Sequence, residues 1–236
     1  MGCMALPYFY IDNLDGENLT LDEDTSKHVV QVLRKKVGDD ILITDGKGLK
    51  ATATITDDNR KRCGVRLSDK EKEEEPQPKV GIAISLVKNA ARFEWFLEKA
   101  TEIGVREIIP LLCERTEKEK FRFDRLNNIL VSAMLQSQQC WLPVLHEPVA
   151  FSTALANQEY ENKFIAHCLP EGKLSLARLS KELTGSSIIF IGPEGDFTEG
   201  EIDTALTKGA KPVSLGNTRL RTETAGMVAA ALLCSY

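Results

Sequence analysis

The chain has 236 residues, enough for one large domain or for a small and a medium domain with separate cores. Its 42% hydrophobic and 28% charged residues are typical of a globular protein. The sequence contains no membrane-length apolar run and no secretory signal pattern, so we expect a cytoplasmic protein. The formal net charge of -5 argues against nucleic-acid binding through bulk charge, and leaves local basic patches for that role.

The cysteines and histidines argue against a metal site. Six cysteines are scattered without a Cys-x-x-Cys pair, and none has a histidine at ligand spacing, so we predict reduced, mostly buried thiols and no metal. The three histidines are His28, His146 and His167. Three are few for chemistry that depends on a histidine base.

The N-terminal segment, residues 1–70, predicts a small and mostly β domain. Strands are expected at 8–11, 41–44, 49–56 and 61–67, and Thr25-Ser26 is expected to cap a helix. Residues 68–78 are rich in charge and proline with almost no apolar side chain, which indicates a linker, placed at 71–79 between the domains.

Residues 80–236 alternate between strand and helix patterns, which predicts an α/β domain with a largely parallel sheet. The expected strands are 80–87, 108–112, 164–169, 188–191 and 213–215. Helices are expected to begin after Asn89, at Asp124 and at Leu174, with Gly104 closing the first. Thr198 and Glu201 form a capping box for a further helix, which Gly209 ends.

The last two strands each lead into a glycine-bearing loop and then a helix. Four consecutive apolar residues, 188–191, suit a strand buried on both faces of a parallel sheet. Because ligands collect at the carboxyl ends of such strands, the loops at Gly192-Pro193 and Gly216 are expected to form one crevice. The alternative is that both are only tight turns.

Common catalytic motifs do not occur. The sequence has no Walker loop, no Gly-x-Gly-x-x-Gly after a strand and no Gly-x-Ser-x-Gly elbow, which argues against a pyrophosphate-bound nucleotide and a serine hydrolase. His167 and Cys168 are adjacent on a predicted strand, where neighbours point to opposite faces, so a nucleophile pair is not favoured. The residues by themselves therefore predict a β module, a linker and an α/β domain with a crevice near the C-terminus.

Four segments of the chain together carry a recognisable pattern. They are His28-Val29-Val30-Gln31-Val32-Leu33-Arg34, Glu98-Lys99-Ala100-Thr101-Glu102-Ile103-Gly104-Val105, Ile191-Gly192-Pro193-Glu194-Gly195 and Leu215-Gly216-Asn217-Thr218-Arg219-Leu220-Arg221-Thr222-Glu223-Thr224-Ala225. These segments closely resemble the bacterial ribosomal RNA small subunit methyltransferase E family, which methylates N3 of a uridine in 16S ribosomal RNA. They follow the family's order and cover nearly the whole chain.

The resemblance implies a PUA-like β-barrel followed by a SPOUT-type α/β domain with a trefoil knot. It further implies S-adenosylmethionine as cofactor, a homodimer, and 16S ribosomal RNA within the small ribosomal subunit as partner. The cofactor-binding residues carried over are Leu169, Ile191, Gly192, Pro193, Glu194, Gly195, Leu215, Gly216, Asn217, Leu220, Arg221, Thr224 and Ala225. Asp196 stands where the family more often has a second glycine, and we interpret it as the start of the turn before Thr198.

Arg221 is the residue we expect to stabilise negative charge on the uracil, with Arg219 and Glu223 as the next candidates. The alternative for Arg221 and Glu223 is an ion pair at a helix start. No residue is assigned as general base, because arginine stays protonated.

RNA is expected to contact local patches of basic residues flanking the crevice, although a solvated surface charge is the alternative for each residue alone. The candidates are Lys27, His28, Arg34 and Lys35 in the first domain and Lys88, Arg92, Arg115, Lys118, Lys120 and Arg122 in the second. Competing functions are methylation of another RNA or atom and a non-catalytic ribosome-assembly factor, with a hydrolase last.

Overall fold

The structure, a computed structural model, describes residues 6–117, 120–169 and 172–234. The chain divides into two compact units. Unit 1 consists of Met1–Glu75 and Met134–Leu142, and unit 2 consists of Pro76–Ala133 and Pro143–Tyr236. Among the described residues, no helix combines the length and the apolar character needed to cross a membrane. Lys118, one of the predicted RNA contacts, lies outside the described residues.

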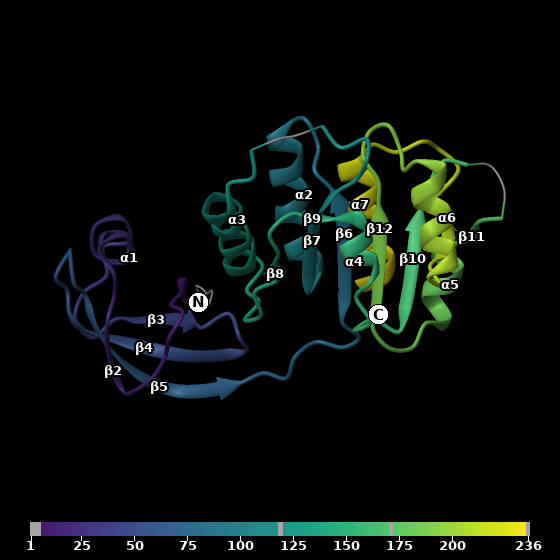
Figure 1. Cartoon of the computed structure of the whole chain (residues 1–236). Coiled ribbons are helices and arrows are strands. Elements are labelled where there is room, and N and C mark those ends of the chain that lie inside the picture. Colours follow the sequence, from purple (N-terminus) through teal and green to yellow (C-terminus); the bar gives the residue numbers. More distant parts are fainter. Residues whose placement is uncertain (1–5, 118–119, 170–171, 235–236) are drawn as a thin grey trace. The chain divides into compact units, whose positions relative to one another are not determined.

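Unit 1 is built on a five-stranded sheet in the order β1-β3-β4-β5-β2 (Figure 1). Its strands are β1 (Tyr8–Tyr10), β2 (Asn18–Thr20), β3 (Asp40–Thr44), β4 (Leu49–Asp57) and β5 (Gly64–Lys72). β1 pairs in parallel with β3, and the other pairs are antiparallel. Alternate residues such as Ile41, Ile43 and Val65 are buried in one core, which is the pattern of a sheet with one face inward. β5 continues to Lys72 and so includes the first residues of the predicted linker.

The helix of unit 1 consists of α1 (Glu23–Lys27) and the π-helix η1 (His28–Val32). The predicted cap at Thr25-Ser26 is wrong, because Asp22 caps the helix by accepting a hydrogen bond from the Thr25 amide at 2.8 Å. A carboxylate at this position also favours the positive end of the helix dipole. The Ser26 hydroxyl is buried instead, where it donates to the Leu21 carbonyl and accepts from the Cys63 amide.

The segment 134–142 belongs to unit 1 through backbone hydrogen bonds with the hairpin loop between β3 and β4. The Gly48 amide donates to the Cys140 carbonyl at 2.9 Å, and the Leu142 amide donates to the Gly46 carbonyl at 2.8 Å. Gly48 has a φ of 90°, and a Cβ atom there would lie 2.5 Å from the Trp141 ring, so the close approach requires glycine. The sequence pattern assigned this segment to the second domain.

Unit 2 contains an eight-stranded sheet whose pairs are all parallel, which confirms the predicted α/β class. The order is β11-β13-β10-β12-β6-β7-β8, with β9 also paired to β7. The strands are β6 (Val80–Ser85), β7 (Glu107–Leu112), β8 (Val144–Leu145), β9 (Val149–Ala150), β10 (Asn162–Ala166), β11 (Leu174–Ser175), β12 (Ser187–Ile191) and β13 (Lys211–Ser214).

Helices cover both faces of this sheet (Figure 1). The helices of the chain after β6 are α2 (Ala90–Ile103), α3 (Phe123–Gln136), α4 (Phe151–Leu155), α5 (Leu176–Leu179), the 3-10 helix η2 (Ser180–Glu182), α6 (Glu199–Thr207) and α7 (Thr222–Cys234). α4 and α6 bury Phe151 and Ile202 against one face, together with Phe190 of β12. α7 contacts α2, β6 and β12 on the other. β12 is therefore buried on both sides, as predicted from its unbroken apolar run.

Several predicted element ends are confirmed and two are wrong. Asn89 caps α2 through a 3.0 Å bond from the Ala91 amide, and Gly104 ends that helix with a φ of 100°. The strand predicted at 164–169 ends at Ala166, because the following residues leave the sheet at its carboxyl edge. The helix predicted at 174–183 begins as the short strand β11, which pairs with β13, before α5 and η2.

Candidate functional site

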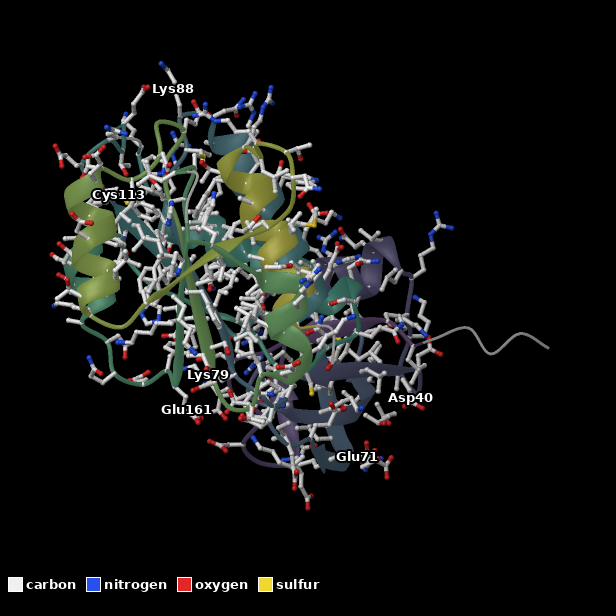
Figure 2. All side chains as sticks on the ribbon, turned by 90° about the vertical axis from the view of Figure 1, so that its right-hand side faces the viewer. Asp40, Glu71, Lys79, Lys88, Cys113 and Glu161 are labelled. Atoms are coloured by element: carbon white, nitrogen blue, oxygen red, sulfur yellow. The ribbon has the colours of Figure 1, made fainter. Side chains whose placement is uncertain are left out.

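The candidate site lies at the carboxyl edge of the parallel sheet. β10 lies between β12 and β13, so the loops that follow these three strands leave the sheet side by side. Figure 2 marks the two edges by Lys79 and Lys88, which precede and follow β6 and lie at opposite ends of unit 2. Side chains and backbone from three distant parts of the sequence therefore meet at one edge, which is the usual place for ligands in such sheets.

These three loops line an open cavity of about 870 Å³. Its lining residues are Arg92, Ala166, His167, Cys168, Lys173, Ile191, Gly192, Pro193, Glu194, Asp196, Val213, Ser214, Leu215, Gly216, Asn217, Thr218, Arg219, Leu220, Arg221, Thr222 and Ala225. Both predicted glycine-bearing loops contribute to it. The predicted shared crevice is thus confirmed.

The loop after β12 is held close to the start of α7. The Thr222 hydroxyl donates a buried hydrogen bond of 3.0 Å to the Gly192 carbonyl. A Cβ atom at Gly192 would lie 3.0 Å from the Phe197 ring, so a side chain here would require the loop to move. The backbone of this loop therefore forms one wall of the cavity in a fixed position.

Asp196 connects the loop after β12 to the end of β10. Its carboxylate accepts a hydrogen bond from the Cys168 amide at 2.7 Å and another from the Phe197 amide at 2.9 Å. Its φ is 66°, in the left-handed region that favours glycine, although aspartate tolerates it better than most residues. A turn does precede Thr198, but Asp196 ends this turn and does not start it as predicted, since the Asp196 amide donates to the Pro193 carbonyl at 2.9 Å.

His167 and Cys168 both line the cavity, so the expectation that they point to opposite faces of a strand does not apply. They follow the last residue of β10 and lie outside the alternation of the sheet. Burial, with a smaller effect of the nearby Lys173, lowers the pKa of His167. Burial, followed by the negative charge of Asp196, raises the pKa of the Cys168 thiol. Both groups are therefore favoured in their neutral forms.

Three arginines line the cavity, from α2 and from the loop before α7. Arg219 and Arg221 are exposed, and neither has an ion-pair partner among the described residues. Arg92 lies 3.6 Å from a Glu194 oxygen and 3.7 Å from a Glu223 oxygen. The considered ion pair between Arg221 and Glu223 is therefore not formed, because Glu223 is buried and faces Arg92.

The predicted cofactor residues fall into two groups. Ten of them line the cavity: Ile191, Gly192, Pro193, Glu194, Leu215, Gly216, Asn217, Leu220, Arg221 and Ala225. Leu169, Gly195 and Thr224 do not line it. Of the predicted catalytic residues, Arg219 and Arg221 line the cavity and Glu223 does not.

The predicted RNA contacts have different surroundings in the two units. In unit 1, Lys27 is paired with Glu23 at 2.9 Å, His28 packs edge-on against Phe9, Arg34 has a φ of 56°, and Lys35 is half-buried. In unit 2, Lys88 is paired with Glu117 at 3.1 Å, and Arg92 lines the cavity. Arg115 donates to the Gly195 carbonyl at 2.7 Å and so supports the loop after β12.

Sequence reasoning did not assign several lining residues, including Lys173, and missed the connection made by Asp196. Two signals could have found some of them. Residues directly after a parallel strand belong to the ligand edge, which would have identified His167 and Cys168. An aspartate in a position suited to glycine indicates that its side chain has a local hydrogen-bonding role.

The chemistry of the cavity suits a small molecule that carries both charges. Its volume lies within the range of about 300–1,000 Å³ common for small-molecule sites. Glu194 and Asp196 supply carboxylates, while Lys173 and the arginines supply positive charge. In the part of the chain that the structure describes, no group of three or more metal-ligating side chains lies together.

Comparisons with known proteins identify related sequences and structures. An RNA methyltransferase domain family matches residues 73–234, and an RNA methyltransferase PUA domain family matches residues 21–68. Ribosomal RNA small subunit methyltransferase E of Rickettsia conorii is 30% identical over 231 residues, which cover 94% of this chain and 92% of that protein.

Two solved structures have the same fold over nearly their full length. A probable rRNA-methyltransferase from Porphyromonas gingivalis superposes with a TM-score of 0.88 at 35% identity, covering 95% of each chain. Ribosomal RNA small subunit methyltransferase E from Neisseria gonorrhoeae, bound to S-adenosyl methionine, superposes with a TM-score of 0.84 at 29% identity, covering 96% of this chain and 95% of that one.

Proposed function

Since the chain belongs to the ribosomal RNA small subunit methyltransferase E family, we propose that it transfers a methyl group from S-adenosylmethionine to N3 of one uridine in 16S ribosomal RNA. The observation that carries this proposal is the single cavity formed by the loops after β10, β12 and β13. We propose ribosomal RNA of the small subunit as the substrate and the cytoplasm as the place of the activity.

The lining of the cavity fits S-adenosylmethionine. This cofactor supplies an electrophilic methyl group on a positively charged sulfur. Leu215 to Asn217 and Gly192 line the cavity, and the glycines among them let the adenine approach the backbone closely. Among the described residues His167 Nδ1 is buried without a hydrogen-bond partner, so a polar group of the bound cofactor would satisfy it. Glu194 and Asp196 offer negative charge to the cationic end of the molecule.

Arg221 is proposed to stabilise the uracil as it loses its N3 proton. Its guanidinium is exposed in the cavity and stays protonated, so its charge can be directed at the oxygen on which negative charge develops. Arg219 is the second candidate from the same loop. Glu223 is proposed to act as a positioning residue, because its carboxylate is buried and lies near Arg92 rather than in the cavity.

The reaction is tested by mass spectrometry of 16S ribosomal RNA from cells that lack the protein. We expect one uridine to lose a methyl group at N3, and the purified protein with S-adenosylmethionine to restore it on isolated small subunits. Methylation of another RNA or another atom would replace the substrate assignment. An unchanged RNA together with no cofactor binding would point to a non-catalytic assembly factor.

The role of Arg221 is tested by comparing Arg221→Ala with Arg221→Lys and Arg219→Ala. Removing one charge-stabilising group from a transition state costs on the order of a hundredfold or more in kcat. We therefore expect Arg221→Ala to lower kcat by about that factor while the Kd for S-adenosylmethionine changes little. Equal losses in kcat and in cofactor affinity would show that Arg221 has a structural role.

We propose that the protein is a homodimer and that its C-terminal segment is knotted, as the family resemblance implies. The outer face of α7 supports the first feature: Met227, Val228, Ala231 and Leu232 are apolar and only partly buried. Such a face is usually covered by another protein surface. Sedimentation analysis should give a dimer, and Val228→Glu should shift it toward the monomer. A wild-type monomer at micromolar concentration would contradict the proposal.

A further inference from the structure

A second cavity, of about 570 Å³, lies in unit 2 between the start of α2 and the segment leading into α3. Its lining residues are Leu86, Val87, Ala90, Ala91, Phe93, Glu94, Lys120, Phe121, Arg122, Arg125 and Leu126. None of them lines the first cavity. The catalytic proposal above makes no use of this second cavity.

The walls of the second cavity are largely apolar, with an aromatic ring available at its side. Leu86, Phe93 and Leu126 are buried, whereas Phe121 is only half-buried. The Phe121 and Phe123 rings lie 6.4 Å apart between centroids and are tilted by 58°. A half-buried phenylalanine in an apolar recess offers a face on which a planar base can stack.

The rim of the second cavity carries excess positive charge. Glu94 is the acidic residue of the lining, and Arg125 forms a two-armed ion pair with it at 2.7 and 3.0 Å. These hydrogen bonds lower the pKa of Glu94. Lys120 and Arg122 are exposed and have no ion-pair partner among the described residues. The two charges that remain therefore suit an anionic ligand.

The first turn of α2 separates the two cavities. Ala90, Ala91, Phe93 and Glu94 line the second, whereas Arg92, between them in sequence, lines the first. The two cavities therefore lie against different sides of the same helical turn. Single-stranded RNA has one phosphate and one base in each nucleotide, so it suits a site that combines an aromatic surface with a positively charged rim.

We propose that the second cavity binds an unpaired nucleotide of the RNA substrate, close in sequence to the methylated one. Its base stacks on Phe121, and its phosphate is bound by Lys120 and Arg122. This inference rests on the proposed function, because it assumes that RNA is presented to the first cavity. The second cavity would then contact the RNA away from the reacting base. Binding a neighbouring nucleotide there helps to hold the target uridine out of the RNA stack.

The test uses Phe121→Ala and the double variant Lys120→Ala/Arg122→Ala, assayed for methyl transfer to isolated small ribosomal subunits. Losing one stacked base costs roughly tenfold in affinity, so KM for the particle should rise by about this factor while the Kd for S-adenosylmethionine is unchanged. Phe121→Trp should retain activity near that of the wild type. Lys208→Ala/Lys211→Ala removes the same charge at exposed positions around the start of β13 and should leave KM unchanged.

An unchanged KM in the double variant overturns the proposal, and so does an equal effect of the control pair. The double variant changes only exposed side chains, so it gives a result even where Phe121→Ala fails to fold. The Kd for a short fluorescent unpaired oligoribonucleotide is measured in parallel. Normal oligoribonucleotide binding with reduced methylation of particles would identify a ribosomal protein as the occupant and reject RNA.

The same measurements separate this inference from the proposed function. If the wild-type protein transfers no methyl group to ribosomal RNA, the proposed function fails. The oligoribonucleotide measurement then still decides on the second cavity. If the wild type is active and the variants match it in KM and in oligoribonucleotide Kd, the second cavity is not an RNA site and the proposed function stands.

Discussion

At the scale of single residues, Asp196 combines an unfavourable backbone conformation with two favourable hydrogen bonds. Its φ of 66° suits glycine, but glycine would lose the bonds from the Cys168 and Phe197 amides. Hydrogen bonds to a charged acceptor stabilise a fold by about 1.5–3 kcal/mol, more than the roughly 1 kcal/mol that a left-handed residue costs. Aspartate at this left-handed position is therefore compatible with a stable loop.

Replacing Asp196 tests this balance. Asp196→Ala keeps the backbone strain and loses both hydrogen bonds, so we expect the free energy of unfolding to fall by about 1–3 kcal/mol and cofactor affinity to fall with it. Asp196→Gly should lose less, since it relieves the strain. Asp196→Asn should lose least. Urea denaturation and titration with S-adenosylmethionine measure both quantities; an alanine variant as stable as the glycine variant would contradict the argument.

His167 gives the stability a defined pH dependence. Its pKa in the folded protein lies below the ordinary value of 6.5, mainly because of burial. The unfolded chain therefore binds more protons between the two pKa values, and stability falls as the pH decreases from 6.5 through the folded pKa. We expect the urea concentration at the midpoint of unfolding to fall over this pH range, and to fall less in the His167→Gln variant than in the wild type. An NMR titration of the ring that gave a pKa above 6.5 would contradict this.

At the scale of elements, the start of α6 is stabilised by a capping box within the helix and by a hydrogen bond from another segment. The Thr198 hydroxyl accepts from the Glu201 amide at 3.3 Å, and Glu201 accepts from the Thr198 amide at 2.8 Å. The other Glu201 oxygen accepts from the Glu114 amide at 2.9 Å, which connects α6 to the segment after β7. Glu201 of the capping box therefore also holds the start of α6, which follows the loop that carries Asp196, against the segment after β7.

We expect Thr198→Ala to lower the free energy of unfolding by about 1 kcal/mol, the usual cost of losing an N-cap side chain. Thr198→Ser retains the hydroxyl and should stay within a few tenths of the wild type. Urea denaturation of both variants measures the difference. A serine variant that is as unstable as the alanine variant would indicate that the methyl group, and not the hydrogen bond, is responsible.

Elements with strong local signals were predicted well. Asn89, Gly104 and the Thr198 capping box are confirmed, because capping depends on residues within a few positions of each other. The short elements β2, β8, β9 and α4 were missed, since they hold too few residues to show a period. Asp22 was overlooked as a cap in favour of hydroxyl residues one turn later.

At the scale of the whole molecule, the sheet class and the shared crevice could be predicted, because unbroken apolar strands indicate a parallel sheet and such sheets bind ligands at one edge. The assignment of 134–142 to unit 1 could not, since it depends on backbone bonds between residues almost a hundred positions apart. Neither could the pairing of Glu223 with Arg92.

Cofactor binding should stabilise unit 2 in a localised way. A ligand at about a hundred times its Kd adds about 2.7 kcal/mol to the free energy of unfolding. We expect S-adenosylmethionine to slow amide hydrogen exchange at residues 166–168, 191–194, 196 and 213–222, which line the cavity. Exchange in β3, β4 and β5 of unit 1 should not change. Mass spectrometry of peptides measures both, and protection concentrated in those strands would contradict the assigned site.

The position of β12 between β6 and β10 affects how the protein can be made. Translation produces β10 before β12, so a nascent chain that has exposed β10 cannot yet join it to β6. β10 can join the sheet next to β6 only after β12, which is synthesised later, has taken its place between them. The residues 213–222 are synthesised later still, so S-adenosylmethionine cannot guide the early steps of folding. Unit 2 must therefore begin to assemble by burying its apolar strands, before the cofactor site exists.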